Sequence, residues 1–508
     1  MDEPLLWLGT LLCALAAAAG LVPVLRRRMR LAALTLGVAL APVLVLADSW
    51  DSSRIADLRD RPALLLVAAI AATAGIAVGG WIFRRRPTWL APALVAAMPF
   101  RIPIDLGGGD ANLLLPLYAV IACGLAATLY GAWRDPAPEP ERSARSDPSA
   151  QSAQSAQSDR KGWWLGAVGW ALAGVVVLYA LQAAYADDIT RGLQNVAFFL
   201  APFAALYLLL AEARWDRRGM RAIVWVLAIE GLVFLLVGAA EYASGELLWN
   251  DKVISGNEAH TYFRVNSLFW DPNILGRYLA VTMTVLAAIV AYGRRPSEVR
   301  GAAACFALFL VLLVVSYSQT STLALLAALL VLVAARWGLA RGIGAGAATL
   351  VALVAAVVLI AGGGLSSETT SGRAGLIDGG LEIARDHPVV GLGSGGFADE
   401  FTARYYEGEG FAAESHTEPV TVAAEQGIVG LLAYAGLLVV SFGALLSATG
   451  LELRKRARGT ALAATLLAVY ALMFVHSLGY AAFLIDPITW AVLAIAGAAL
   501  LPAPRPSG

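Results

Sequence analysis

Residues 371–430 read SGRAGLIDGGLEIARDHPVVGLGSGGFADEFTARYYEGEGFAAESHTEPVTVAAEQGIVG, a polar stretch that lies between long apolar runs. Unpaired backbone groups and charged side chains each cost several kcal/mol inside a bilayer, so a stretch this long and polar cannot face hydrocarbon. We therefore expect it to lie at a membrane surface or to line a wet cavity, and to carry the chemistry of the protein.

The composition indicates a membrane protein with many spans. The chain has 508 residues, of which 59% are hydrophobic and 15% charged, and its mean hydropathy is +0.70. Soluble proteins have roughly 25% charged residues. Lys+Arg and Asp+Glu balance at 37 each, so the net charge gives no sign of a nucleic-acid partner. The 3 cysteines lie in apolar runs and the 4 histidines lack zinc-site spacing, so we expect no disulfide and no metal.

Apolar runs predict the spans of an all-α polytopic membrane protein. With about twenty residues per crossing, we count about fifteen spans, of which the fourth is short. The first has no basic flank or cleavage site before it, so we expect it to be retained. The spans are expected near 5–25, 31–47, 63–83, 88–100, 112–133, 163–184, 195–213, 221–241, 272–293, 301–317, 320–336, 342–362, 420–448, 460–480 and 485–502.

Every second connection between these spans is rich in arginine, as the positive-inside rule requires of cytoplasmic connections. The connections on the other side are acidic or mixed and include the long polar loop at 363–419. This alternation predicts an external N-terminus, an external loop and a cytoplasmic C-terminus. One cytoplasmic connection, 134–162, begins rich in proline and continues as a Ser-Ala-Gln repeat, so we expect a disordered linker there.

A second polar region precedes the span at 272–293. Asp271 to Asn273 is expected to form the turn that starts this span, with Asp271 as its cap. Arg264 and Arg277 flank the turn, either as interfacial arginines or as functional ones. Gln319, in the outer hairpin at 316–322, could reach the same external cavity.

One ionisable residue lies in the middle of a span. Glu230 stands within AIVWVLAIEGLVFLLVG, where a charge costs about 2.5–3.5 kcal/mol, so it needs a partner in the bundle interior. That partner could be structural, such as a hydroxyl group or an arginine, or part of a proton relay.

The long loop contains a helical segment, a glycine run and a histidine. Apolar residues between 376 and 383 recur at helical spacing before Pro388, which predicts an amphipathic helix on the outer leaflet. Gly391 and Gly393 belong to a chance GxGxxG that we expect to turn sharply or approach a ligand, since no strand-helix unit can surround it. His416 precedes Glu425 at the mouth of the next span, and is either a surface imidazole or a catalytic group.

Four motifs in this order resemble the O-antigen ligase and polysaccharide polymerase family of bacterial membrane glycosyltransferases. They are FWDPNIL (269–275), SGR (371–373), DHPVVGLGSGGF (386–397) and SHTEPVTVAAEQGIVGLL (415–432). Members often have Asn after the loop histidine, where this chain has Thr417.

The resemblance covers residues 88–502 and implies a core of about twelve spans of the GT-C type, with the large external loop between two late spans. The three spans before it then form an extra N-terminal module. The implied division is 1–87 for that module, 88–133 for the first core spans, 134–162 for the linker, 163–362 for the core bundle, 363–419 for the external catalytic loop and 420–508 for the C-terminal spans.

The resemblance also implies an activity in cell-surface polysaccharide synthesis. A glycan would pass from an undecaprenyl-diphosphate carrier to a glycan or lipid acceptor hydroxyl, outside the bacterial cytoplasmic membrane, without metal, nucleotide sugar or other cofactor. Arg264, Arg277 and Arg373 are then candidates to bind the diphosphate, because a guanidinium matches phosphate geometry. His416 is the candidate base, and Glu425 would hold its imidazole or cap a helix. Supporting roles fall to Asp271, Asn273, Gln319, Gly391 and Gly393.

Other functions remain open at this point. The acceptor could be lipid A core, another repeat unit or a protein hydroxyl. A flippase for a lipid-linked sugar is the alternative from another class, although the chain lacks the internal symmetry typical of transporters.

Overall fold

The computed structural model describes residues 3–50, 52, 55–56, 59–105, 110–134, 152–213, 215–259, 262–360, 373–405, 415–449 and 461–500. Nearly all of the regular structure in this part of the chain is helical, as predicted. The exception is a hairpin of β1 (Ile102–Asp105) and β2 (Asp110–Leu113), which pair antiparallel with Ile102 opposite Leu113. Ile102 and Ile104 alternate along β1 with the period of a strand, which the search for apolar runs overlooked.

A helix lies at the position of each predicted span. These helices are α1 (Glu3–Leu21), α2 (Arg27–Asp48), α4 (Pro62–Arg85), η1 with α5 (Pro87–Trp89, Leu90–Ala97), α6 (Leu115–Arg134), α7 (Ser152–Gln182), α8 with η3 and α9 (Ile189–Asn195, Val196–Leu200, Ala201–Glu212), α10 (Arg217–Ser244), α12 (Pro272–Tyr292), α13 (Pro296–Val315), α14 (Gln319–Trp337), α15 (Leu339–Ile360), α18 (Glu418–Thr449), α19 (Ala461–Ser477) and α20 (Pro487–Leu500). Among the described residues, 11 helices are long and apolar enough to cross a membrane. Three shorter apolar helices accompany them, at Pro87–Ala97, Ala461–Ser477 and Pro487–Ala498.

The linker prediction needs one correction. Helix α7 begins at Ser152, so the end of the segment that we expected to be disordered is helical. Alanine and glutamine have good helix propensity, and the Ser-Ala-Gln repeat can therefore extend the apolar helix that follows it. Residues 135–151 lie outside the described part of the chain.

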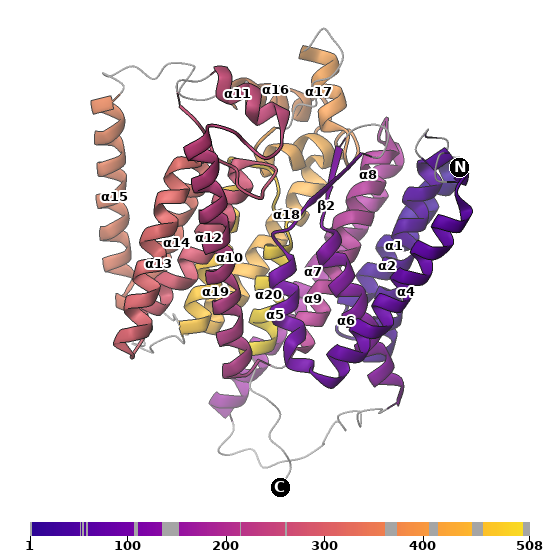
Figure 1. Ribbon diagram of the computed structural model, residues 1–508, viewed down its shortest axis with the longest axis horizontal. Coiled ribbons are helices and arrows are strands. Elements are labelled where there is room, and N and C mark those ends of the chain that lie inside the picture. The colour runs from indigo at the N-terminus through magenta and orange to yellow at the C-terminus, as the bar shows by residue number, and fades with distance from the viewer. Residues whose placement is uncertain are drawn as a thin grey trace.

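The bundle has two distinct ends (Figure 1). The start of α1 lies at the same end as the short polar helices α11 (Asp251–Ala259), α16 (Arg373–Asp386) and α17 (Phe397–Tyr405). The arginine-rich start of α2 contacts the ends of two other helices. Arg27 of α2 forms an ion pair with Glu212 of α9 at 2.7 Å. Arg28 donates from Nε to the Ala132 carbonyl of α6 at 2.9 Å. These contacts show that arginine-rich connections, which the sequence predicts to be cytoplasmic, lie at the same end of the bundle.

The first two helices are packed into the bundle. Helix α1 lies against α2, α7 and α9, and the Trp7 indole of α1 donates to the Ala180 carbonyl of α7 at 3.1 Å. Helix α4 lies against α6, and Gly80 is the one residue of α4 that is buried. Of the N-terminal spans, α1 and α2 therefore contribute to the same core as α7 and α9.

The buried Glu230 of α10 has a hydroxyl partner. The Tyr278 phenol of α12 donates a hydrogen bond to the Glu230 carboxyl group, and both side chains are buried. The Tyr278 ring also packs edge-on against Phe234, with centroids 5.3 Å apart. This contact is the structural type of partner that the sequence analysis considered.

Helix α18 is interrupted near its start, and the glycine run at 391–396 forms hydrogen bonds with the interrupted turn. Gly427 has φ 59° and ψ −157°, which interrupts the helical hydrogen bonds around it. The run supplies replacements: Leu392 and Gly393 donate to the carbonyls of Ala424 and Glu425 at 3.0 and 2.9 Å. In return, Ile428 donates to the Pro388 carbonyl at 2.9 Å. Backbone groups that the break leaves without helical partners are thus hydrogen-bonded by the polar loop.

Candidate active site

The turn that starts α12 forms as predicted. The Asp271 side chain caps the helix by accepting a hydrogen bond from the Asn273 amide at 2.6 Å. The Asn273 side-chain oxygen accepts from the Ser318 hydroxyl at 2.9 Å, and Ser318 caps α14. This polar cluster fixes the start of α12 against the start of α14.

Arg277 lies one turn further along α12 and is almost completely buried. Its guanidinium group forms an ion pair with Asp486 at 2.7 Å, and the two side chains are 2% and 4% exposed. Asp486 also accepts from the Ile488 amide at 2.8 Å, which caps the start of α20. Asp486-Pro487 therefore repeats the Asp-Pro helix start of α12.

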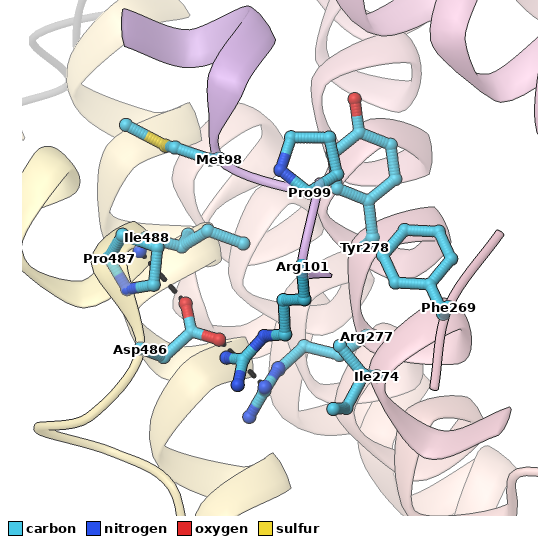
Figure 2. Close-up of a pocket in the computed structure, with 10 residues that line it drawn as sticks. All are labelled: Met98, Pro99, Arg101, Phe269, Ile274, Arg277, Tyr278, Asp486, Pro487 and Ile488. Carbon is cyan, nitrogen blue, oxygen red and sulfur yellow. Dashed lines mark hydrogen bonds and ion pairs between the residues drawn. The ribbon is translucent and has the colours of Figure 1, made fainter. Parts of the chain in front are cut away.

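A second arginine points at the same carboxylate (Figure 2). Arg101, between α5 and β1, lies beside Arg277 and Asp486 around a cavity of about 20 Å³. Burial lowers the pKa of the Arg101 guanidinium, Asp486 opposes that change, and Arg277 adds to it. Because two guanidinium groups lie near one carboxylate, with which Arg277 forms an ion pair, the cluster has an excess positive charge and suits an anion.

His416 lies in a short connection just before α18. Its backbone has φ 56°, a left-handed conformation that is uncommon for any residue but glycine and often marks functional sites. The next residue, Thr417, donates from its hydroxyl to the Leu478 carbonyl at 3.2 Å. The His416 ring lies near the Tyr480 ring, with centroids 6.2 Å apart. Tyr480 in turn lies beside Arg277, whose Cζ is 5.6 Å from the ring centroid.

Glu425 faces the glycine run. Its carboxylate, which is buried, accepts hydrogen bonds from the backbone amides of Gly395 and of Phe397, the latter at 3.3 Å. Phe397 is the first residue of α17, so the carboxylate lies at the amino end of that helix. These contacts correspond to the capping alternative.

The other predicted residues are placed as follows. The Arg264 side chain donates from Nε to the Ser316 carbonyl at 3.2 Å, and Arg264 is not among the residues that line the cavity around Arg277. Arg373 is the first residue of α16, and its side chain lies outside the described part of the structure. Gln319 is the exposed first residue of α14. Gly391 has φ 73°, and a Cβ there would overlap the backbone of Glu425.

Three residues of this cluster were missed in the sequence analysis: Arg101, Tyr480 and Asp486. Asp486 had a usable signal, because Asp-Pro at the start of an apolar run is the same pattern as Asp271-Pro272. Arg101 and Tyr480 are single residues at the edges of apolar runs, where interfacial side chains are common. Within the described residues, no group of three or more His, Cys, Asp and Glu side chains could hold a metal ion.

Comparison with known proteins agrees with the motifs. Residues 304–435 match the family model described as O-antigen ligase, and this range runs from α13 to α18 and includes the polar loop. No curated protein matches the chain. The match and the many apolar helices point to a multi-pass protein of the bacterial inner membrane with a glycosyltransferase activity of the ligase or polymerase type. The stretch that contains the polar loop thus matches the O-antigen ligase family model, and three of the four motifs lie within the matched residues.

Proposed function

We propose that this protein transfers a glycan from an undecaprenyl-diphosphate carrier to an acceptor hydroxyl on the external face of the membrane. The observation that carries the proposal is the cluster of Arg101, Arg277 and Asp486, in which positive charge exceeds negative charge. The O-antigen ligase match gives the reaction class. The carrier, the acceptor and the side of the membrane are the proposed details.

The arginines would bind the leaving group. In the reaction, the bond between the anomeric carbon and the diphosphate oxygen breaks, and the negative charge on the carrier diphosphate increases. Guanidinium groups stabilise that charge through paired hydrogen bonds and stay protonated at neutral pH. A diphosphate is larger than the cavity of about 20 Å³, so donor binding is expected to widen it. Arg264 and Arg373 remain candidates for contacts at the outer end.

His416 would act as the base. The acceptor oxygen forms the new bond to the anomeric carbon, and its proton passes to the imidazole and then to solvent. Histidine has an ordinary pKa of about 6.5, so it accepts a proton at neutral pH. Glu425 is proposed to support this arrangement indirectly, through the start of α17.

The external location rests on the charge pattern. The candidate site lies toward the end of the bundle that carries α16, α17 and the start of α1, opposite the arginine-rich ends. By the positive-inside rule, arginine-rich connections are cytoplasmic, so the site would open to the outside.

The test is a reconstituted transfer assay. Purified protein in lipid vesicles would receive undecaprenyl-diphosphate-linked glycan extracted from the bacterium that makes the protein, with and without a chelator. We expect release of undecaprenyl diphosphate by the wild type, its loss in His416→Ala, and its persistence with chelator. His387→Ala is the matched control, because His387 is an exposed histidine of the same polar loop.

Each outcome has a different meaning. A ladder of products would identify a polymerase, and one product would identify a ligase. Movement of an intact lipid-linked glycan between leaflets, without release of the carrier, would contradict the proposal and favour a flippase. Transfer at the wild-type rate by His416→Ala would remove the histidine from its proposed role.

A further inference from the structure

The connection between α19 and α20, residues 478–486, contacts both halves of the candidate site. On one side, the Leu478 carbonyl accepts from Thr417 at 3.2 Å, and the Phe483 amide donates to the Glu418 carboxylate at 3.1 Å. Both contacts anchor the residues that follow His416. On the other side, Asp486 ends the same connection and binds Arg277.

Tyr480 is the side chain of this connection that faces both halves. Its ring centroid lies 6.2 Å from the His416 ring centroid and 5.6 Å from the Arg277 Cζ. Arg101 also has Tyr480 among its ionisable neighbours. One aromatic ring therefore lies close to both the candidate base and the arginine pair.

A buried polar network lies beside the Tyr480 ring. The His476 ring lies 5.8 Å from the Tyr480 ring, and the His476 side chain is fully buried. Its Nε2 is 3.1 Å from the Ser321 hydroxyl, which is itself 2.7 Å from the Ser318 hydroxyl. Since Ser318 also binds Asn273, the support extends to the capped start of α12. The network therefore connects the surroundings of Tyr480 to the same helix that carries Arg277.

We infer that Tyr480 is a positioning residue whose ring sets the separation between His416 and the pair formed by Arg101 and Arg277. The inference rests on the proposed function, because the separation matters only if a base and a diphosphate act on the same anomeric carbon. Donor contacts come from the arginines, whereas the approach of the acceptor oxygen depends on His416. Loss of the ring should therefore lower kcat far more than it raises the KM for the donor. A misplacement of about 1 Å can lower a rate about 100-fold.

The experiment compares Tyr480→Leu and Tyr480→Phe with the wild type in the vesicle assay. We expect Tyr480→Leu to lower kcat about 10- to 100-fold while the donor KM changes less than about threefold. We expect Tyr480→Phe to retain at least about a third of the wild-type kcat, because it keeps the ring. Binding of undecaprenyl diphosphate, measured separately, should be similar in all three proteins.

The control is Tyr130→Leu. The Tyr130 ring of α6 also lies over an arginine, with its centroid 4.0 Å from the Arg84 Cζ, but at the arginine-rich end of the bundle. Its kcat should stay near the wild-type value. Thermal unfolding of each variant would show that kcat refers to folded protein.

The outcomes separate this inference from the proposed function. Equal kcat values for wild type and Tyr480→Leu would overturn the inference alone, as would a Tyr480→Phe variant as slow as Tyr480→Leu. If Tyr480→Leu does not fold, the Tyr480→Phe rate still decides, because a large loss with an intact ring contradicts positioning by the ring. An inactive wild type that binds undecaprenyl diphosphate would overturn the proposed transfer and this inference with it.

Discussion

The Arg277 guanidinium and the Asp486 carboxylate lie 2.7 Å apart, and the two side chains are only 2% and 4% exposed. Arg277 belongs to the first turns of α12, and Asp486 caps α20. The pair thus joins the start of α12 to the end of the connection between α19 and α20. Because Arg101 lies beside it, the same pair is also the centre of the candidate anion site.

Removing one partner of this pair should be more harmful than removing both. Asp486→Leu leaves buried arginine charge without its carboxylate, and the unfolding free energy should fall by about 3–5 kcal/mol. The double variant Arg277→Leu with Asp486→Leu should recover part of that loss, because Arg101 still lacks its neighbouring carboxylate, and should be inactive in transfer. Unfolding in mixed micelles checks stability, and a double variant as unstable as Asp486→Leu would show that the two charges are not coupled.

Arg101 should matter more for donor binding than Arg264. Arg101→Gln removes one of two cations at the cavity and should weaken binding of undecaprenyl diphosphate about 10- to 100-fold, the range for a charge-assisted hydrogen bond. Arg264 is held by the Ser316 carbonyl away from that cavity, so Arg264→Gln should have a smaller effect. Arg295→Gln, an exposed arginine before α13, is the control. A larger loss of undecaprenyl-diphosphate binding in Arg264→Gln than in Arg101→Gln would place the diphosphate site at Arg264 instead of at this cavity.

At Glu425, removal of the charge should be less damaging to the protein than removal of the hydrogen-bond-accepting oxygen. Glu425→Gln keeps an acceptor for the Gly395 and Phe397 amides, so kcat should stay within about threefold of the wild type if the group caps α17. Glu425→Ala leaves buried amides unpaired and should destabilise the protein by about 1–3 kcal/mol. A Gln variant that is stable but transfers 100-fold more slowly would instead support a direct role beside the imidazole.

Gly391 should not accept a side chain. Gly391→Ala requires φ 73° in a residue with a Cβ, and that Cβ would overlap the backbone of Glu425. We expect a loss of more than about 2 kcal/mol, or no folded protein. Gly375→Ala in α16 is the matched control, because nothing lies within 4 Å of its Cβ position and alanine favours a helix. Equal stability of the two variants would mean that the glycine run does not pack against α18 as described.

Local patterns predicted the helices and their caps well. Apolar runs gave the position of each long helix, and Asp271 to Asn273 gave the start of α12, because apolar patterning and helix capping depend on neighbouring residues in the chain. For Glu230, the sequence predicted only the kind of partner, such as a hydroxyl group or an arginine. Tyr278 could not be named, because the packing of α10 against α12 decides which hydroxyl group comes close.

The candidate site was harder to predict because its residues meet only through helix packing. Arg277 was singled out for its position beside a polar turn, but nothing near it in the chain indicates Arg101 or Asp486 as its neighbours. His416 and Tyr480 likewise come from different connections. The break at Gly427 was also missed, since the glycine lies in an apolar run that otherwise continues as a helix.

The break in α18 has a consequence for the engineering of chimeras. Leu392 and Gly393 supply hydrogen bonds that the helix itself lacks, and Ile428 returns one to Pro388. A chimera that received the polar loop of another protein with this domain match, but kept this α18, would have to match those backbone pairs residue for residue. The loop and the first half of α18 are therefore best exchanged together, from the start of α16 to beyond Gly427.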